Sequence, residues 1–179
     1  MKKFLVLVFM FLLMGCEINL TNTPTKQVEK FLINYQTLNK KVVNKLENEI
    51  KEDVSLTNDQ QEKYLDFWKK HYQGLNYTIK DQTENGDEAI VIAEIEVNDY
   101  SKIISESSAY LSNNPEEFVD IYGEYDLTKF NDYKLEQLLK AKERVTYTLE
   151  FKVKKENKKW KLENLSEEDY SKLSGMYNY

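Results

Sequence analysis

Apolar and polar residues alternate without interruption between Val145 and Lys154. Successive side chains of a β-strand point to opposite faces of a sheet, so this pattern predicts a strand with one face in a core and the other in water. The apolar members of the segment are Val145, Tyr147, Leu149, Phe151 and Val153. A fold that accommodates this chain must therefore contain a sheet with one buried face.

The same period of two recurs earlier in the chain, on both sides of a tight-turn signal at Asn85-Gly86. The alternating apolar residues are Leu75, Tyr77 and Ile79 before the turn, and Ala89, Val91, Ala93, Ile95 and Val97 after it. Residues 156–159 predict a second turn, and Trp160 with Leu162 predicts a last short strand. Two hairpins predict an antiparallel sheet of about four strands.

Apolar residues at spacings of three and four predict a long amphipathic helix from Pro24 to Lys51. A second helix is predicted to follow Thr57, because Gln60 completes a capping box. Between the two hairpins, the stretch Asp99 to Arg144 predicts an inserted helical segment, whose last helix runs from Thr128 to Arg144. The predicted fold class is therefore α+β, with the sheet packed on the long N-terminal helix.

Two lysines follow Met1, and an unbroken apolar run extends from Phe4 to Leu13. Ten helical residues extend about 15 Å, half of a ~30 Å hydrocarbon core, so the run predicts a signal peptide and not a membrane span. The segment Leu13-Met14-Gly15-Cys16 resembles the lipobox of bacterial lipoproteins, in which a small residue precedes a cysteine that receives diacylglycerol. An ordinary secretory signal with an incidental cysteine, or a buried cysteine in a cytosolic protein, is the alternative.

The lipobox resemblance implies a lipoprotein signal peptide (1–15) and a lipidated tether (16–24), and the predicted elements place a single α+β domain after them (25–179). A nine-residue tether extends about 30 Å at most. We therefore expect the domain to lie close to the extracytoplasmic face of the cell membrane, attached to membrane lipid through acylated Cys16.

The composition excludes several classes of protein. The formal net charge is −6, and nucleic-acid binding needs clustered Lys and Arg, so no nucleic-acid partner is expected. Cys16 is the only cysteine and His71 the only histidine, which excludes a disulfide framework, a zinc site and a Cys–His catalytic pair within one chain. Phosphate-loop, dinucleotide, serine-elbow and HExxH motifs are absent from the sequence. We expect no metal, no cofactor and no catalytic residues.

The layout resembles small extracytoplasmic proteins of the nuclear-transport-factor-two-like, or cystatin-like, superfamily, which includes many bacterial lipoproteins of unknown function. The similarity rests on PTKQVEKFL (24–32), on the strand after the turn at 85–87 and on NKKWKL (157–162), and it covers about 24–165. It implies a curved sheet wrapped on a long helix, often with a pocket at the open end. Enzymes and non-enzymes both occur in the superfamily, so the fold leaves the function open.

The candidate residues for lining such a pocket are Trp68, His71, Tyr147 and Trp160. Aromatic side chains of this kind suit a sugar or an apolar ligand. Core packing is the alternative, because the aromatic residues fall at inward positions of their elements. A general-base role for His71 would need an orienting carboxylate and a cavity.

The sequence favours a membrane-anchored, non-catalytic module of the cell envelope that binds a small ligand or an unknown envelope protein. The alternative is a small pocket enzyme of the same superfamily that uses acid–base chemistry. A substrate-binding subunit of a transporter is a third possibility, for which the chain is short.

Overall fold

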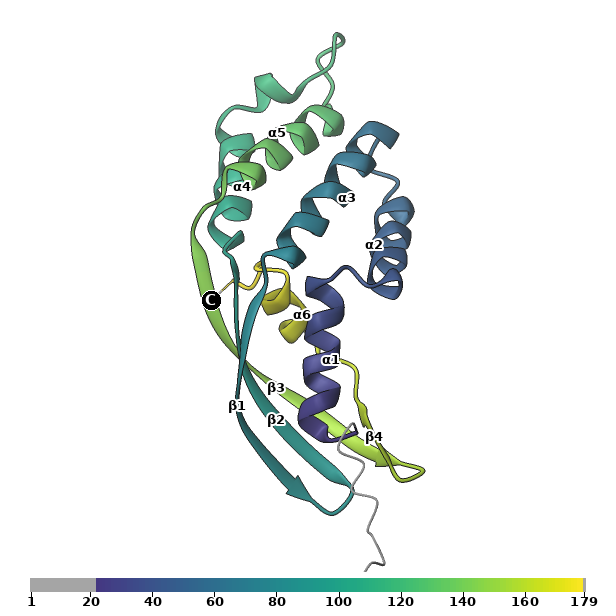
Figure 1. The fold of residues 1–179 in the computed structure, drawn as a ribbon. Helices are drawn as coiled ribbons and strands as arrows, with labels where there is room; N and C mark the ends of the chain where they lie inside the picture. The colour runs from purple at the N-terminus through teal and green to yellow at the C-terminus, as the bar shows by residue number, and fades with distance from the viewer. Residues whose placement is uncertain (1–21, 179) are drawn as a thin grey trace, which may run out of the picture.

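The computed structural model describes residues 22–178, and its elements are drawn in Figure 1. Within that range the chain forms six α-helices, one short 3₁₀ helix and four strands. In chain order they are α1 (Pro24–Gln36), α2 (Lys40–Glu52), α3 (Asn58–Gln73), β1 (Asn76–Asn85), β2 (Glu88–Asn98), α4 (Ser101–Asn113), η1 (Pro115–Phe118), α5 (Leu127–Lys140), β3 (Arg144–Glu156), β4 (Lys159–Leu162) and α6 (Glu167–Leu173).

The four strands form one antiparallel sheet in the order β1-β2-β3-β4, which confirms the predicted α+β class and the predicted strand pairing. Gly86 has φ +64° in the β1–β2 turn, a conformation that glycine adopts without a steric penalty. Asn157 and Lys158 have φ +50° and +63° in the β3–β4 turn. Two successive positive φ values match the twist of the strands that they join.

The predicted inward residues of the two central strands are buried, except for Val145, which is half-buried. Ala89, Val91, Ala93, Ile95 and Val97 of β2, and Tyr147, Leu149, Phe151 and Val153 of β3, are at most 5% exposed. Helix α1 covers this face with Val28 and Leu32, which are fully buried, and its Phe31 ring lies 6.0 Å from the ring of Phe151. The main hydrophobic core therefore lies between α1 and the sheet.

The single helix predicted from Pro24 to Lys51 is wrong, because the chain turns sharply after Gln36 and continues as α2. Leu38 has φ +51°, which no α-helix accommodates. Asn39 then caps α2, since its Oδ1 accepts a hydrogen bond from the Lys41 backbone N–H at 2.9 Å. The apolar stripe is divided accordingly: α1 packs on the sheet, while α2 contacts α3.

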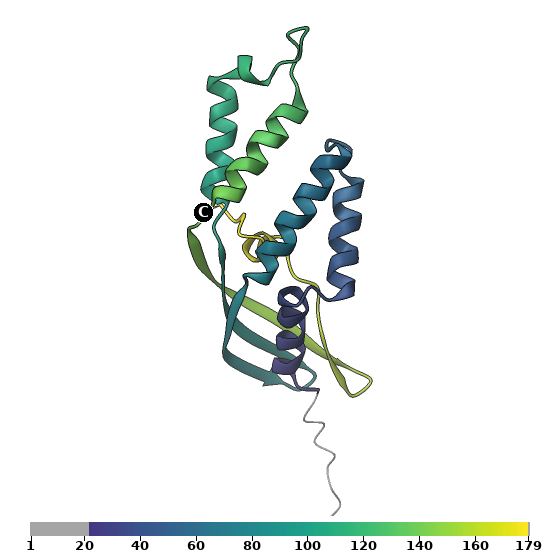
Figure 2. The same cartoon turned by 45° about the horizontal axis from the view of Figure 1, so that its top comes forward.

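The helices α2 to α5 extend beyond the end of the sheet as two pairs, α2 with α3 and α4 with α5 (Figure 2). The predicted capping box is present at the start of α3, where the side chains of Thr57 and Gln60 bond reciprocally to backbone N–H groups. The helix predicted from Thr128 to Arg144 is too long, because α5 ends at Lys140. Arg144 instead opens β3, and its guanidinium donates to the carbonyls of Gly74 and Glu96, both at 2.8 Å.

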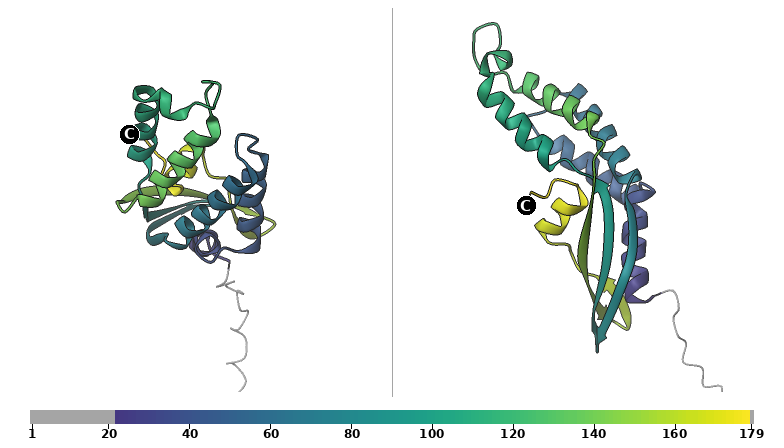
Figure 3. Two further views of the ribbon diagram at one scale, coloured as in Figure 1. Left: turned by 90° about the horizontal axis from the view of Figure 1, so that it is seen from above. Right: turned by 90° about the vertical axis from the view of Figure 1, so that its left-hand side faces the viewer.

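The C-terminal residues join the sheet to the helical extension, as the right-hand view of Figure 3 shows. Leu173 of α6 is fully buried in the main core. Gly175 has φ +68°, and its carbonyl accepts from the Tyr100 N–H at 2.7 Å. A Cβ at Gly175 would lie 1.9 Å from the Asn98 carbonyl oxygen, so only glycine fits this crossing.

The predicted signal peptide and Cys16 lie outside the described residues. Asn22 is the first described residue. Its side chain accepts a hydrogen bond from the Trp160 N–H at 2.6 Å and donates one to the Trp160 carbonyl at 3.2 Å. Helix α1 therefore starts beside the β3–β4 hairpin. Among residues 22–178, no helix has the length and apolar character needed to span a membrane.

Candidate functional site

A cleft of about 650 Å³ lies where the helical extension meets the C-terminal residues. Its walls come from the end of α1, from α2 and the loop after it, and from α3, α5 and α6. The lining residues are Tyr35, Val42, Lys45, Leu46, Glu49, Ile50, Asp53, Ser55, Leu56, Tyr64, Trp68, Tyr72, Asn131, Lys134, Tyr170, Ser171, Ser174 and Met176. The volume falls within the range of small-molecule sites, roughly 300–1,000 Å³.

Helix α2 gives the cleft an apolar and a polar stripe. Val42, Leu46 and Ile50 recur at spacings of four and are at most 8% exposed. Lys45, Glu49 and Asp53 recur at the same spacing on the neighbouring stripe, because residues four apart lie one above the other on a helix. A ligand along α2 would contact both stripes.

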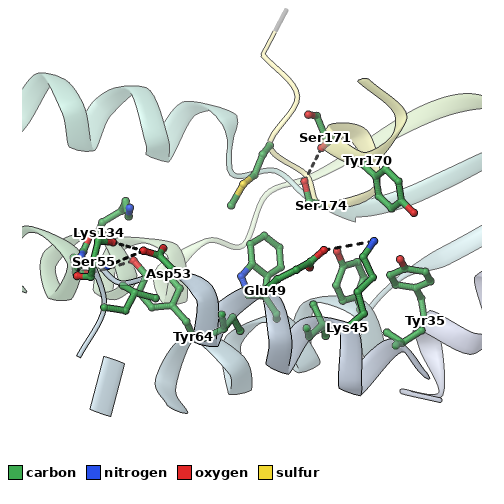
Figure 4. Close-up of a pocket in the computed structure, with 18 residues that line it drawn as sticks. Tyr35, Lys45, Glu49, Asp53, Ser55, Tyr64, Lys134, Tyr170, Ser171 and Ser174 are labelled. Atoms are coloured by element: carbon green, nitrogen blue, oxygen red, sulfur yellow. Dashed lines mark hydrogen bonds and ion pairs between the residues drawn. The ribbon is translucent and has the colours of Figure 1, made fainter. Parts of the chain in front are cut away.

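The charged groups of the cleft gather at two ends, as Figure 4 shows. At one end, Lys45 Nζ lies 3.6 Å from a Glu49 carboxylate oxygen and 4.2 Å from the centre of the Tyr170 ring. This lysine therefore has both an ionic and an aromatic partner within the cleft.

At the other end lie Asp53, in the loop that connects α2 to α3, and Lys134 of α5. The Asp53 carboxylate accepts from the Ser55 N–H at 3.0 Å and from the Ser55 hydroxyl at 2.5 Å. These hydrogen bonds hold the pKa of Asp53 below its usual range. Burial lowers the pKa of the Lys134 ammonium, an effect that Asp53 opposes.

The buried tyrosines of the cleft remain protonated. Burial raises the pKa of Tyr35, Tyr64 and Tyr72 well above the ordinary value of 10. The Tyr64 hydroxyl donates to the Asn131 carbonyl at 3.2 Å, and the Asn131 amide donates to the Ser55 carbonyl at 3.1 Å. These bonds connect α3, α5 and the loop after α2, so the walls of the cleft are fixed relative to one another.

The structure does not bring the four predicted pocket residues together. Trp68 lines the cleft, whereas His71, Tyr147 and Trp160 are not among its lining residues. Tyr147 is buried in the sheet core, with its ring 5.9 Å from that of Tyr177. Trp160 lies beside Asn22, and the Lys155 ammonium lies 4.3 Å from the centre of its ring.

His71 is a buried histidine that attaches α6 to α3. Its Nε2 lies 3.0 Å from the Leu173 carbonyl oxygen, and its side chain is surrounded by the rings of Trp68, Tyr72 and Tyr100. Burial lowers its pKa from 6.5 to about 4, so the ring is neutral at physiological pH and Nε2 carries the proton that it donates. Nδ1 is buried without a hydrogen-bond partner in the described part of the chain.

Sequence reasoning missed most of the cleft, including Lys45, Glu49, Asp53 and Lys134. The polar stripe of α2 is visible as charges at spacings of four, but such a stripe is typical of any solvated helix face. Lys134 and Tyr170 come from elements more than 30 residues apart. No pattern within either element indicates that both face α2.

The cleft offers a ligand an apolar floor, several hydroxyl groups and charges at both ends. Among residues 22–178, no group of three His, Cys, Asp or Glu side chains could hold a metal ion. The chemistry that the lining residues support is recognition of an organic molecule with apolar and polar parts.

No known family model matches the chain, and no curated protein is similar to it. A solved structure from Bacillus subtilis subsp. subtilis str. 168, named "putative lipoprotein (ycdA)", is similar over 78% of this chain, with 19% identity and a TM-score of 0.45. This chain spans 46% of that structure, which is less than half of its length. A likeness of this degree carries no inference about family or function.

Proposed function

We propose that this chain is a lipid-anchored, extracytoplasmic binding module of the cell envelope, without catalytic activity, and that its ligand occupies the cleft. The observation that carries the binding role is the cleft of about 650 Å³, in which apolar and polar side chains converge. The lipobox resemblance at Leu13-Met14-Gly15-Cys16 supports the anchor. The proposal includes a nuclear-transport-factor-two-like, or cystatin-like, domain, in line with the sheet that covers α1.

The position of the cleft suits a protein attached through its N-terminus. Asn22 is bonded to the β3–β4 hairpin at the start of α1, and Tyr35 near the end of the helix lines the cleft. A helix of 13 residues is about 20 Å long. An anchor at Cys16 would therefore leave the cleft displaced from the membrane and open to ligands.

An enzymatic role that uses His71 gains no support from the geometry. The ring is buried against Leu173, outside the cleft, and its lowered pKa makes it a weak base. We therefore retain the binding role as the proposed function.

The anchor is tested by labelling cells that express the full chain with radioactive palmitate. Wild type and the neighbouring variant Glu17→Gln should incorporate the label, while Cys16→Ser should lose it, because Cys16 is the only thiol in the chain. Incorporation that persists in Cys16→Ser would contradict the anchor.

The cleft is tested with the neutral dye 1-anilinonaphthalene, whose fluorescence rises when it enters an apolar site. The full chain carrying Cys16→Ser is used, so that no attached lipid competes. Ser171→Trp should weaken dye binding about tenfold or more by filling the cleft, because a tryptophan occupies most of the space that the dye needs. Ser112→Trp, on the exposed face of α4, should leave the affinity within about twofold.

Met176→Trp fills the same cleft from the residues after α6 and provides a second variant if Ser171→Trp fails to fold. Circular dichroism establishes that each variant is folded. If the Cys16→Ser parent binds the dye with the same affinity as its Ser171→Trp and Met176→Trp variants, the cleft is excluded as the ligand site.

A further inference from the structure

The cleft contains a cation that the protein itself leaves without a direct counter-ion. Lys134 of α5 is half-buried and lines the cleft. Among the described residues 22–178, no carboxylate forms an ion pair with its ammonium group, whereas Lys45 at the other end is paired with Glu49 at 3.6 Å. The two lysines of the cleft therefore differ in what they can offer a ligand.

Two acids come into question as partners of Lys134: Asp53, whose charge raises the pKa of the lysine, and Asp132 on the same helix, and both are hydrogen-bonded to other groups. Asp53 accepts both of its short hydrogen bonds from Ser55. Asp132, which lies two residues before Lys134, accepts from the Gln60 side-chain amide at 3.0 Å.

The surroundings of the Lys134 ammonium group are largely aromatic. Its Nζ lies 6.0 Å from the centre of the Tyr64 ring and 5.8 Å from that of Phe130. Contacts at this distance are weak, and they leave the donors of the ammonium group available. Because the side chain is half-buried, its charge is incompletely solvated. This burial lowers the pKa of the ammonium group, and the charge of Asp53 opposes the effect only in part. A ligand anion would restore the missing interaction.

The floor of the cleft is apolar. Leu46, Ile50, Tyr64 and Tyr72 are between 6% and 8% exposed, and the apolar lining also includes Tyr35, Val42, Leu56, Trp68 and Met176. A ligand that is anionic throughout would leave this surface uncovered. A ligand that is apolar throughout would cover Lys134 and leave its charge desolvated, which is costly.

We propose that the cleft binds an anionic amphiphile, in which an apolar body lies along α2 and a single carboxylate or phosphate group contacts Lys134. This inference rests on the proposed function and adds the chemical class of its ligand. A fatty acid and a single-chain phosphate ester share this chemistry.

The test uses two dyes that differ by one charged group, the neutral 1-anilinonaphthalene and its anionic 8-sulfonate. In the full chain carrying Cys16→Ser, the anionic dye should bind about tenfold more tightly, in keeping with a hydrogen bond to a charged group. Lys134→Met keeps the aliphatic stem and removes the charge, so it should abolish this preference and leave the affinity for the neutral dye within about twofold.

Lys140→Met is the matched control, because Lys140 belongs to the same helix, is 60% exposed and is paired with Glu136 at 2.8 Å. It should preserve the affinity for both dyes, and Lys134→Arg should retain the preference for the anion. A preference that persists in Lys134→Met, or equal affinities of the two dyes in the parent protein, would overturn the inference.

Competition then distinguishes the anionic groups. Laurate or dodecyl phosphate should displace the anionic dye at concentrations about tenfold lower than dodecanol, and the stronger competitor identifies the preferred head group. Displacement by dodecanol at equal concentration contradicts the inference. The proposed function is tested independently of this inference. It fails if the affinities of both dyes are unchanged in Ser171→Trp and Met176→Trp.

Discussion

The sheet with α1 and the helical extension are stabilised in different ways. Among the described residues, the core around the sheet contains 18 buried apolar residues, to which α2 and α3 contribute Val42, Leu46 and Tyr72, and the second core, within the extension, contains 6. The larger core stabilises the sheet half through burial, at roughly 25 cal/mol per Å² of apolar surface. The extension has far less buried surface and needs other contacts.

The extension relies on directional hydrogen bonds between its helices. Gln60, which is 1% exposed, donates to the Thr128 carbonyl at 2.8 Å, and the Tyr64 and Asn131 side chains form similar bonds to the backbone. Side chains bonded to backbone fix the relative positions of helices more precisely than apolar contact does. The cleft lies where this more sparsely packed extension meets α1 and α6.

The largest expected effect belongs to the sheet core. Leu149→Ala should lower the free energy of unfolding by about 2–5 kcal/mol, because the side chain is 1% exposed and its removal leaves a cavity. Leu139→Ala in α5, where the side chain is 57% exposed, should change it by about 0.5 kcal/mol or less. Urea denaturation measures both. Equal effects of the two variants would contradict the comparison.

The junction between the halves should be sensitive to acid through His71. The pKa is about 4 in the folded protein and about 6.5 in the unfolded chain, so between these values only the unfolded state binds a proton. Stability should therefore fall as the pH is lowered from 6.5 to 4, by about 3 kcal/mol from this residue.

The control for this prediction is His71→Gln, whose amide can donate to Leu173 but does not titrate. Its free energy of unfolding should depend less on pH across the same window. Parallel pH profiles of wild type and His71→Gln would show that the histidine does not contribute.

The hydrogen bonds of the extension are tested by Gln60→Leu, which keeps the volume and removes the polar groups. It should cost about 1–3 kcal/mol, because the Thr128 carbonyl and the Thr57 N–H lose their partner. Gln61→Leu, in the next position of α3, should change the stability by about 0.5 kcal/mol or less. Chemical denaturation that gives the two variants the same stability would show that apolar contact alone holds these helices.

The smallest effect is expected at the hairpin between η1 and α5, at the top of Figure 1. Ile121 is 90% exposed there, so Ile121→Ser should shift the free energy of unfolding by about 0.5 kcal/mol or less. A loss above about 1 kcal/mol in thermal or urea unfolding would show that this side chain contributes to a core after all.

Local patterns predicted the elements whose signals are contained in a few neighbouring residues. The alternation in β2 and β3, the Asn85-Gly86 turn and the capping box at Thr57 are present in the structure. The break at Leu38 was missed because a leucine continues the apolar stripe, and only the Asn39 cap hints at a new helix. The end of α5 was misplaced because Arg144 suits a helix end, although its guanidinium bonds to Gly74 and Glu96.

The candidate site could be predicted only in part. Trp68 lines the cleft, but Tyr147 and Trp160 obey the same inward periodicity and belong to the sheet core. Periodicity predicts which side chains point inward, but it does not predict which cavity they line. The sequence gives equally little sign that Lys134 lacks an ion-pair partner among the described residues, because Asp53 bonds to Ser55 within the loop after α2 and Asp132 bonds to Gln60 of α3.

The sequence by itself determined the α+β class, the antiparallel pairing and the inward faces of the strands, because these depend on periods and turns a few residues long. Tertiary structure alone decided the sharp turn between α1 and α2, the role of His71 as an attachment for α6, and the assembly of the cleft from α2, α5 and α6. Those features arise from contacts between residues distant in the chain, whose geometry is set only when the separate apolar faces pack together.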